Sequence, residues 1–95
     1  MLKIRENDIY RGGEKIGYIR RNDLFDRDGD KLGYWSESAG DIFDRSGKKI
    51  GYTEGNHLKD AHGGTVAKLS DIHAHISGGS YDDLVRAAIR MLLGD

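Results

Sequence analysis

The four histidines of this sequence are the side chains best suited to metal chemistry, and all lie in the second half of the chain. His73 and His75 are two residues apart, so on a β-strand both would point to one face, a spacing that could bind zinc or nickel. His62 lies in a predicted turn, and no cysteine or third ligand is fixed by spacing. A zinc site normally has three or four protein ligands, so we predict surface histidines and no cofactor, with metal binding as an alternative.

Acidic and glycine-rich segments indicate turns and not a catalytic site. Asp26–Asp30 reads DRDGD, but a calcium-binding EF-hand needs its glycine at the sixth loop position, a late glutamate and flanking helices. The sequence also has no nucleophile elbow, no glycine-rich phosphate loop ahead of a helix and no paired carboxylates outside turns. We therefore predict that the chain is not an enzyme.

Tyrosines at equivalent places in a repeated segment are candidates for ligand contact. Tyr18, Tyr34 and Tyr52 could form an aromatic ring that stacks sugars or holds a cation, although packing against the core is the simpler interpretation. Lysine takes the two remaining equivalent places, at Lys3 and Lys68.

The only tryptophan, Trp35, interrupts the repeat and follows Tyr34. We place it on the outward face and expect it to be the best single contact, because exposed tryptophan is enriched at interfaces. A carbohydrate-binding hairpin repeat is a further alternative, although such repeats usually carry more tryptophan than this chain.

The repeated segment that positions these side chains occurs four times: DIYRGGEKIGY (8–18), DLFDRDGDKLGY (23–34), DIFDRSGKKIGY (41–52) and a worn copy, HLKDAHGGTVAK (57–68). The tetrapeptide Asp44–Gly47 fits a type I turn followed by a glycine at positive φ, which predicts a short-looped hairpin. The second and fourth copies have the same turn, whereas Gly12-Gly13 predicts a two-residue turn in the first.

Each predicted turn fixes a register for its hairpin. Ile42 is expected opposite Ile50 and Phe43 opposite Lys49, so that aliphatic pairs line one face and aromatic–lysine pairs the other. The equivalent predicted pairs are Ile9–Ile16, Leu24–Leu32, Leu58–Val66, Tyr10–Lys15 and Phe25–Lys31. A lone hairpin cannot bury its apolar face, so we expect the hairpins to be arranged radially around a common core. Gly17, Gly33 and Gly51 would allow neighbouring hairpins to approach closely.

The ends of the repeat region each look like half a hairpin. Met1–Arg5 aligns with a second strand, and the alternating segment Asp71–Ile76 reads as a first strand. Pairing of the two would close the ring and leave no exposed edge. We therefore expect four continuous hairpins and one split hairpin.

A helix is predicted after the linker Ser77–Gly79, over Asp82–Leu93, with Ser80 as its N-cap and Gly94 at its C-terminus. Its apolar stripe is expected to dock on the open end of the ring and consists of Leu84, Val85, Ala88, Ile89 and Leu92. Its two arginines, Arg86 and Arg90, are expected to share another face, within reach of the acids in the first turn.

The amino-acid composition limits the classes of partner that this chain is expected to bind. The 95 residues carry a net charge of −1, which argues against general affinity for nucleic acid or anionic membranes. There is no cysteine, and no apolar segment is long enough for a signal peptide or a membrane span, so we expect a cytoplasmic protein.

Hairpins that end in aliphatic-Gly-Tyr and precede a C-terminal helix resemble the bacterial β-flower proteins. The residues that carry the resemblance are the copies at Asp8–Tyr18, Asp23–Tyr34 and Asp41–Tyr52 and the helix Asp82–Leu93. The resemblance implies a mainly β fold of four to five radially packed hairpins and no known activity.

The predicted organisation is a hairpin ring over residues 1–77 and a helix over residues 80–94 in one domain. We expect a small non-catalytic binding or scaffold module for an unknown protein or small-molecule partner. Self-association through the helix or the outward aromatics is an alternative.

Overall fold

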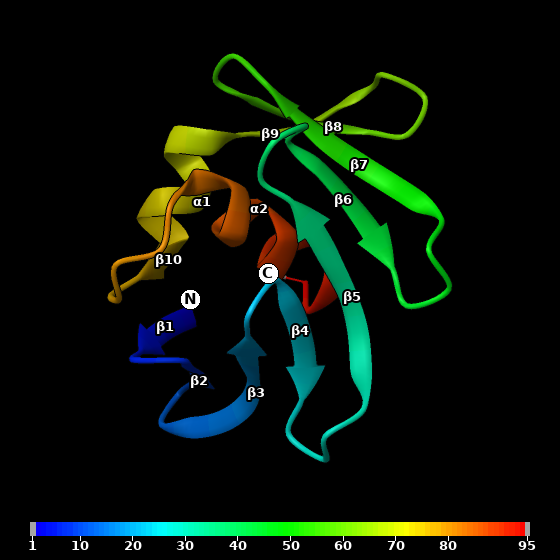
Figure 1. Ribbon diagram of the computed structural model, residues 1–95. Helices are drawn as coiled ribbons and strands as arrows, with labels where there is room; N and C mark the ends of the chain where they lie inside the picture. Colours follow the sequence, from blue (N-terminus) through cyan, green and yellow to red (C-terminus); the bar gives the residue numbers. More distant parts are fainter. Residues whose placement is uncertain (1, 95) are drawn as a thin grey trace.

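Short strands joined by tight turns make up most of the protein, as Figure 1 shows. The computed structural model describes residues 2–94, and Met1 and Asp95 lie outside the described part. The strands are β1 (Leu2–Arg5), β2 (Asp8–Arg11), β3 (Glu14–Arg20), β4 (Asp23–Asp26), β5 (Lys31–Ser36), β6 (Asp41–Asp44), β7 (Lys49–Glu54), β8 (His57–Asp60), β9 (Thr65–Lys68) and β10 (Ile76–Ser77). The helices are α1 (Leu69–His75) and α2 (Asp83–Leu92). The prediction of a mainly β chain is confirmed.

All ten described strands belong to one sheet, in the order β10-β1-β2-β3-β4-β5-β6-β7-β8-β9. Neighbours are antiparallel except β10 and β1, which are parallel. The sheet curls around α2 (Figure 1), and its two edges, β9 and β10, do not pair with each other within residues 2–94. Helix α1 contacts both edge strands and therefore lies across the opening.

The prediction of separate, radially arranged hairpins is not supported. Each hairpin is hydrogen-bonded to the next, for example through the pairing of β5 with β6. The backbone N–H of Trp35 also donates to the carbonyl of Asn22 at 3.1 Å, and the equivalent bonds are Ile19 to Asn7, Thr53 to Gly40 and Leu69 to Asn56. A continuous ladder satisfies the strand edges that isolated hairpins would expose. For this reason the repeats form a sheet.

The hairpin turns have the predicted geometry. The N–H of Gly47 donates to the carbonyl of Asp44 at 3.0 Å, and Gly47 has φ 91°. The Asp44 carboxylate accepts the N–H groups of Ser46 at 2.9 Å and Lys48 at 3.0 Å. Asp26 and Asp60 accept the same bonds in their turns. In the first copy, both central glycines have positive φ, as a two-residue primed turn requires.

The predicted register is confirmed on the outer face and wrong on the inner one. Phe43 pairs with Lys49, but Ile42 lies opposite Gly51 and not Ile50. A β-bulge between the two rungs inserts Ile50 as an extra residue, which packs half-buried at the rim of the core. The same shift places Ile9, Leu24 and Leu58 opposite Gly17, Gly33 and Ala67.

The predicted closing strand at Asp71–Ile76 is a helix over most of its length. Leu69 and Ile72 are buried three residues apart on α1, whereas Ala74, which the alternating pattern would bury with Ile72, is exposed. Only Ile76 and Ser77 are extended, and they pair in parallel with β1. The two segments do lie side by side, through a short parallel pair in place of a split hairpin, but this pairing does not close the sheet, and the predicted closed ring is not supported.

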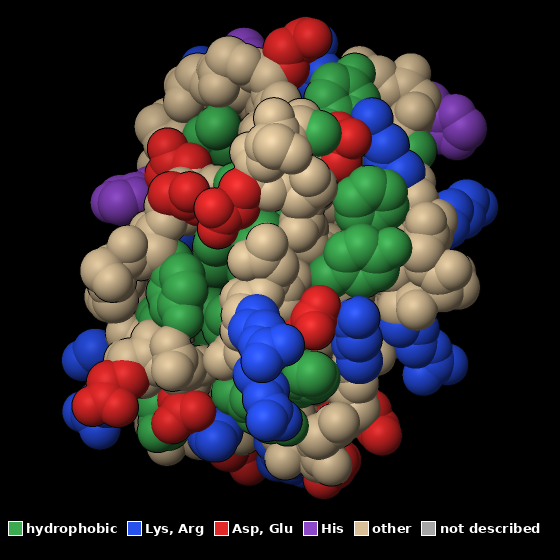
Figure 2. Space-filling model, in the orientation of Figure 1, with side chains coloured by type: hydrophobic (Ala, Val, Ile, Leu, Met, Phe, Trp, Pro, Cys, Tyr) green, Lys and Arg blue, Asp and Glu red, His purple; other side chains and the backbone are tan. Residues whose placement is uncertain are grey.

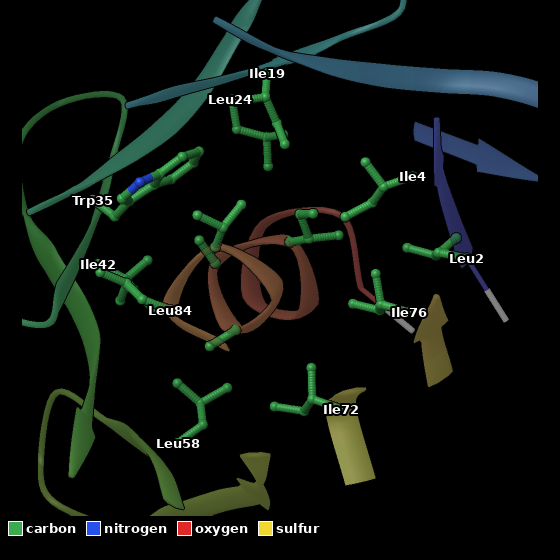
Figure 3. Packing of buried hydrophobic residues seen from close by; sticks show 14 of the residues in the cluster. Leu2, Ile4, Ile19, Leu24, Trp35, Ile42, Leu58, Ile72, Ile76 and Leu84 are labelled. Atoms are coloured by element: carbon green, nitrogen blue, oxygen red, sulfur yellow. The ribbon is translucent and has the colours of Figure 1, made fainter. Parts of the chain in front are cut away.

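Helix α2 fills the concave side of the sheet, as Figure 3 shows along its axis. Asp82 caps the helix by accepting the N–H of Val85 at 3.2 Å, so the prediction of Ser80 as the cap is wrong. The expected stripe is directed into the sheet, with Ile89 fully buried and Leu92 half-buried. Each fully buried aliphatic side chain contributes about 1.5–3 kcal/mol, so docking of this helix accounts for a large share of the stability.

The C-terminal end of α2 packs on the glycines of the repeats. Alanine at Gly33 would place its Cβ against the carbonyl oxygen of Phe43 and the side chain of Leu92. Equivalent contacts join Gly17 to Leu93 and Gly51 to Met91. The close approach expected at these glycines is thus between neighbouring strands and also between the sheet and the helix.

A buried arginine of α2 is hydrogen-bonded to the backbone in and just after the short edge strand β10. The guanidinium of Arg86 donates to the carbonyl oxygens of Ile76 and Gly78, the latter at 2.8 Å, and the side chain is only 4% exposed. The prediction that Arg86 and Arg90 share a face within reach of the first-turn acids is wrong for Arg86, whose guanidinium is buried and binds backbone carbonyls. Buried carbonyl groups need donors, and Arg86 supplies them here.

Substitution of Gly33 by alanine should lower the free energy of unfolding by about 1–3 kcal/mol, because the new methyl group overlaps a backbone carbonyl and Leu92. Urea unfolding measures the change. Gly64→Ala is the control, since its Cβ would meet only the end of the Asp60 side chain, at 3.0 Å. We expect the control to change stability by less than about 1 kcal/mol. Equal losses in both variants would contradict this role of Gly33.

Substitution of Asp44 by asparagine should remove a pH-dependent contribution to the free energy of unfolding. The hydrogen bond from the Ser46 hydroxyl, followed by that from the Lys48 N–H, lowers the pKa of Asp44. A carboxyl with a depressed folded pKa stabilises the fold above its unfolded pKa, and this contribution is lost as pH falls through the folded value. The wild type should therefore exceed the variant in urea unfolding at about pH 7, and the difference should shrink below about pH 4. A difference independent of pH would refute this.

Candidate functional site

The outer face of the sheet is built from a three-residue unit. In the second copy, the Lys31 ammonium lies 3.3 Å from the Asp23 carboxylate and 4.7 Å from the centroid of the Tyr34 ring. On the other side of the same ring, Phe43 of the next strand stacks at 4.9 Å between centroids with an interplanar angle of 17°. Strand alternation directs all of these side chains outward, away from α2.

The unit recurs across the sheet, and we call the whole row the outer ladder. Its ion pairs are Asp8–Lys15 at 3.1 Å, Asp23–Lys31 at 3.3 Å and Asp41–Lys49 at 3.1 Å. The matching lysine–ring contacts are Lys15–Tyr18, Lys31–Tyr34 and Lys49–Tyr52, and the first ring stack is Tyr18–Phe25 at 5.1 Å. Figure 2 shows basic and acidic side chains interspersed on one face of the molecule.

The tyrosine faces of the ladder are largely occupied from within the chain. Tyr18 and Tyr34 each have a phenylalanine on one side and a lysine on the side of the paired aspartate. Stacking of a sugar requires a free ring face. The geometry therefore does not favour the carbohydrate alternative at these residues.

Tyr52 differs because its cross-strand neighbour is Lys59 and not an aromatic residue. The Lys59 ammonium lies 2.9 Å from the carboxylate of Glu54. This hydrogen bond lowers the pKa of Glu54 and raises the pKa of Lys59. The Glu54 side chain is well exposed, so this ion pair contributes little to stability.

The placement of Trp35 on the outward face is wrong. Its side chain is 2% exposed and points toward α2 with Ile42 and Leu24 (Figure 3). Since Tyr34 faces outward, the next residue along the strand must face inward. Trp35 is thus a core residue, and it offers no surface to a partner.

The histidines lie apart from one another. His73 and His75 are on α1, so the shared strand face predicted for them does not exist. The His75 Nδ1 atom is 2.8 Å from the Asp71 carbonyl oxygen, and the His73 Nδ1 atom is 3.5 Å from the Asp83 carboxylate. His62 lies in the turn of the fourth hairpin. Residues 2–94 contain no group of three His, Cys, Asp or Glu side chains that could hold a metal ion.

A cavity of about 420 Å³ lies at the N-terminal end of the outer ladder. We call it the Tyr10 pocket, and its lining includes Lys3, Arg5, Tyr10, Ser77 and the Gly12–Gly13 turn. Lys3 lies opposite Tyr10 in the register that places Tyr34 opposite Phe43. No ladder tyrosine therefore covers Tyr10 from this side, and the pocket occupies the position that such a ring would fill.

The sequence did not predict Lys3, Arg5 and Tyr10 as site residues. A signal was present, since the repeat alignment places Lys3 at the position of Tyr18 and Tyr34. What the alignment could not show is that the neighbouring strand β10 is too short to cover the resulting gap.

Comparison with protein-family models, with curated proteins and with solved structures found no match to this chain. Neither helix in the described part of the chain is long and apolar enough to cross a membrane.

Tyr34 and Phe43 should stabilise the fold cooperatively, because their rings stack across β5 and β6. In a double-mutant cycle with leucine at both sites, we expect a coupling of about 0.5–1.5 kcal/mol from urea unfolding. The matched control combines Tyr18→Leu with Phe43→Leu, two residues from different stacks, and should be additive within about 0.5 kcal/mol. A coupling of zero for the stacked pair would show that the rings only cover the sheet.

Proposed function

We propose that this chain is a small non-catalytic binding module in which the hairpin repeats are the scaffold and the Tyr10 pocket is the ligand site. The observation that carries the proposal is the position of the pocket. It opens beside Lys3, at one of the two ladder positions where a lysine stands in place of a tyrosine. Terminal repeats of such arrays are atypical in general, and here the departure leaves an accessible recess.

The lining of the pocket supports binding more than catalysis. Among its described side chains are two cations, a phenol and a hydroxyl, and no carboxylate or imidazole that would act as a general base. The apolar stripe of α2 is buried inside the chain and is therefore not a docking face for a second copy. The resemblance to β-flower proteins assigns no activity and stays a prediction from the repeats.

A fragment screen by heteronuclear NMR tests the proposal. Small organic molecules of mixed charge should shift the backbone amide signals of Lys3, Arg5, Tyr10, Gly12, Gly13 and Ser77. The decisive variant is Lys3→Tyr, which supplies the ring that the ladder lacks and fills the pocket without removing any buried group. Lys3 is exposed, so the variant should fold as the wild type does.

Lys68→Tyr is the matched control, because Lys68 occupies the equivalent place in the last copy and lies far along the sheet from β1. Binding that is lost in Lys3→Tyr and kept in Lys68→Tyr supports the proposal. Fragments that bind elsewhere, or equally well to both variants, overturn it.

A further inference from the structure

The stacked rungs of the outer ladder show what shape of group fits beside Tyr10. Tyr34 lies flat against Phe43, and its hydroxyl reaches the turn of the next hairpin, 3.3 Å from where a Cβ on Gly47 would be. Tyr18 repeats the arrangement on Phe25 and reaches Gly29, at 3.5 Å. A planar ring with a polar substituent at its far end is therefore the shape that this fold accommodates at each stacked rung.

No aromatic ring occupies the corresponding space at the first hairpin, where only the Arg5 guanidinium lies over Tyr10. Tyr10 takes the position of Phe25 and Phe43, and the turn glycines are Gly12 and Gly13. A Cβ built on either glycine would have no atom within 4 Å, whereas a tyrosine hydroxyl lies beside each equivalent glycine in the later turns. The open volume thus extends from the Tyr10 ring to the backbone of the turn.

The charge of the pocket is not balanced as it is elsewhere in the ladder. Each ladder lysine binds an aspartate, but Lys3 faces Ser77 on one side and Tyr10 on the other, and it has no acidic partner among the described residues. Arg5 lies opposite Asp8, whose carboxylate is already bound by Lys15 at 3.1 Å. The Arg5 guanidinium instead lies over the Tyr10 ring at 5.8 Å from its centroid, farther than the rings that stack at 4.9 and 5.1 Å in the other rungs. Two cations beside an open recess favour an anionic ligand.

From these two features, and given the binding role proposed above, we propose that the Tyr10 pocket binds a small aromatic carboxylate with a single ring. The ring stacks on Tyr10 in the place of the missing tyrosine. The carboxylate accepts hydrogen bonds from Lys3 and Arg5, and a polar group opposite it points to the Gly12–Gly13 turn. A volume of about 420 Å³ admits a ligand of this size.

Isothermal titration with para-hydroxybenzoate tests the ligand class. The matched compounds are para-hydroxybenzyl alcohol, which lacks the charge, and cyclohexanecarboxylate, which lacks the aromatic face. We expect each to bind at least roughly 10-fold more weakly than para-hydroxybenzoate, since a charge-assisted contact or a ring stack is lost. The affinity for para-hydroxybenzoate should also fall as salt is raised.

Variants of the same exposed lysines locate the site. Lys3→Gln should weaken binding of para-hydroxybenzoate by roughly 10-fold and Lys3→Tyr should abolish it, whereas Lys68→Gln should leave it unchanged. Urea unfolding of each variant establishes that the fold is retained.

The outcomes separate this inference from the binding role itself. If inorganic phosphate or a fragment binds in a way that Lys3→Tyr abolishes, but para-hydroxybenzoate does not, the pocket is a ligand site and the inference of an aromatic carboxylate is wrong. Equal binding of the alcohol or of cyclohexanecarboxylate also overturns it. If no compound shows binding sensitive to Lys3→Tyr, both proposals fail.

Discussion

The packing of α2 inside the curled sheet is the interaction on which the rest of the structure depends. Each hairpin offers one row of aliphatic side chains, too little for a core of its own. The sheet bends so that the inward residues of every hairpin meet one helix, with Ile42, Leu58 and Ile89 among the fully buried side chains. Bulges bend the strands at each copy, and glycines without side chains let the end of the helix lie against them.

The outer face follows from the same alternation. Once the aliphatic residues face α2, the aromatics and lysines must face solvent, and they stack on one another because neighbouring strands are about 4.8 Å apart. The Tyr34 ring therefore contacts Phe43 on one face, and the Lys31 ammonium lies over the same ring. The interior hairpins of such a repeat are stabilised by rings from their neighbours. The first hairpin has no such ring on its β1 side, where Lys3 and Arg5 lie beside Tyr10.

The two ends of the sheet are completed by elements outside the repeat. Helix α1 bridges the opening between β9 and β10, and Arg86 supplies donors to carbonyls beside the short edge strand. A fifth hairpin is unnecessary, because Leu69 and Ile72 already bury one face of α1 against the core. The Tyr10 pocket lies beside this short edge strand, and Ser77 of β10 is one of its lining residues.

The sequence by itself determined the hairpins, their turns and the outer rungs, because these depend on residues close together in the chain. Asp44, Ser46 and Gly47 specify their turn whatever surrounds it, and Phe43 then faces Lys49. Tertiary structure decided what local pattern leaves ambiguous. The segment Asp71–Ile76 alternates as a strand would, but it is helical over most of its length, with Leu69 and Ile72 of α1 buried in the core. Trp35 is buried because the curved sheet brings α2 against that face, and the pocket beside Tyr10 forms only where residues 3 and 77, distant in the chain, become neighbours.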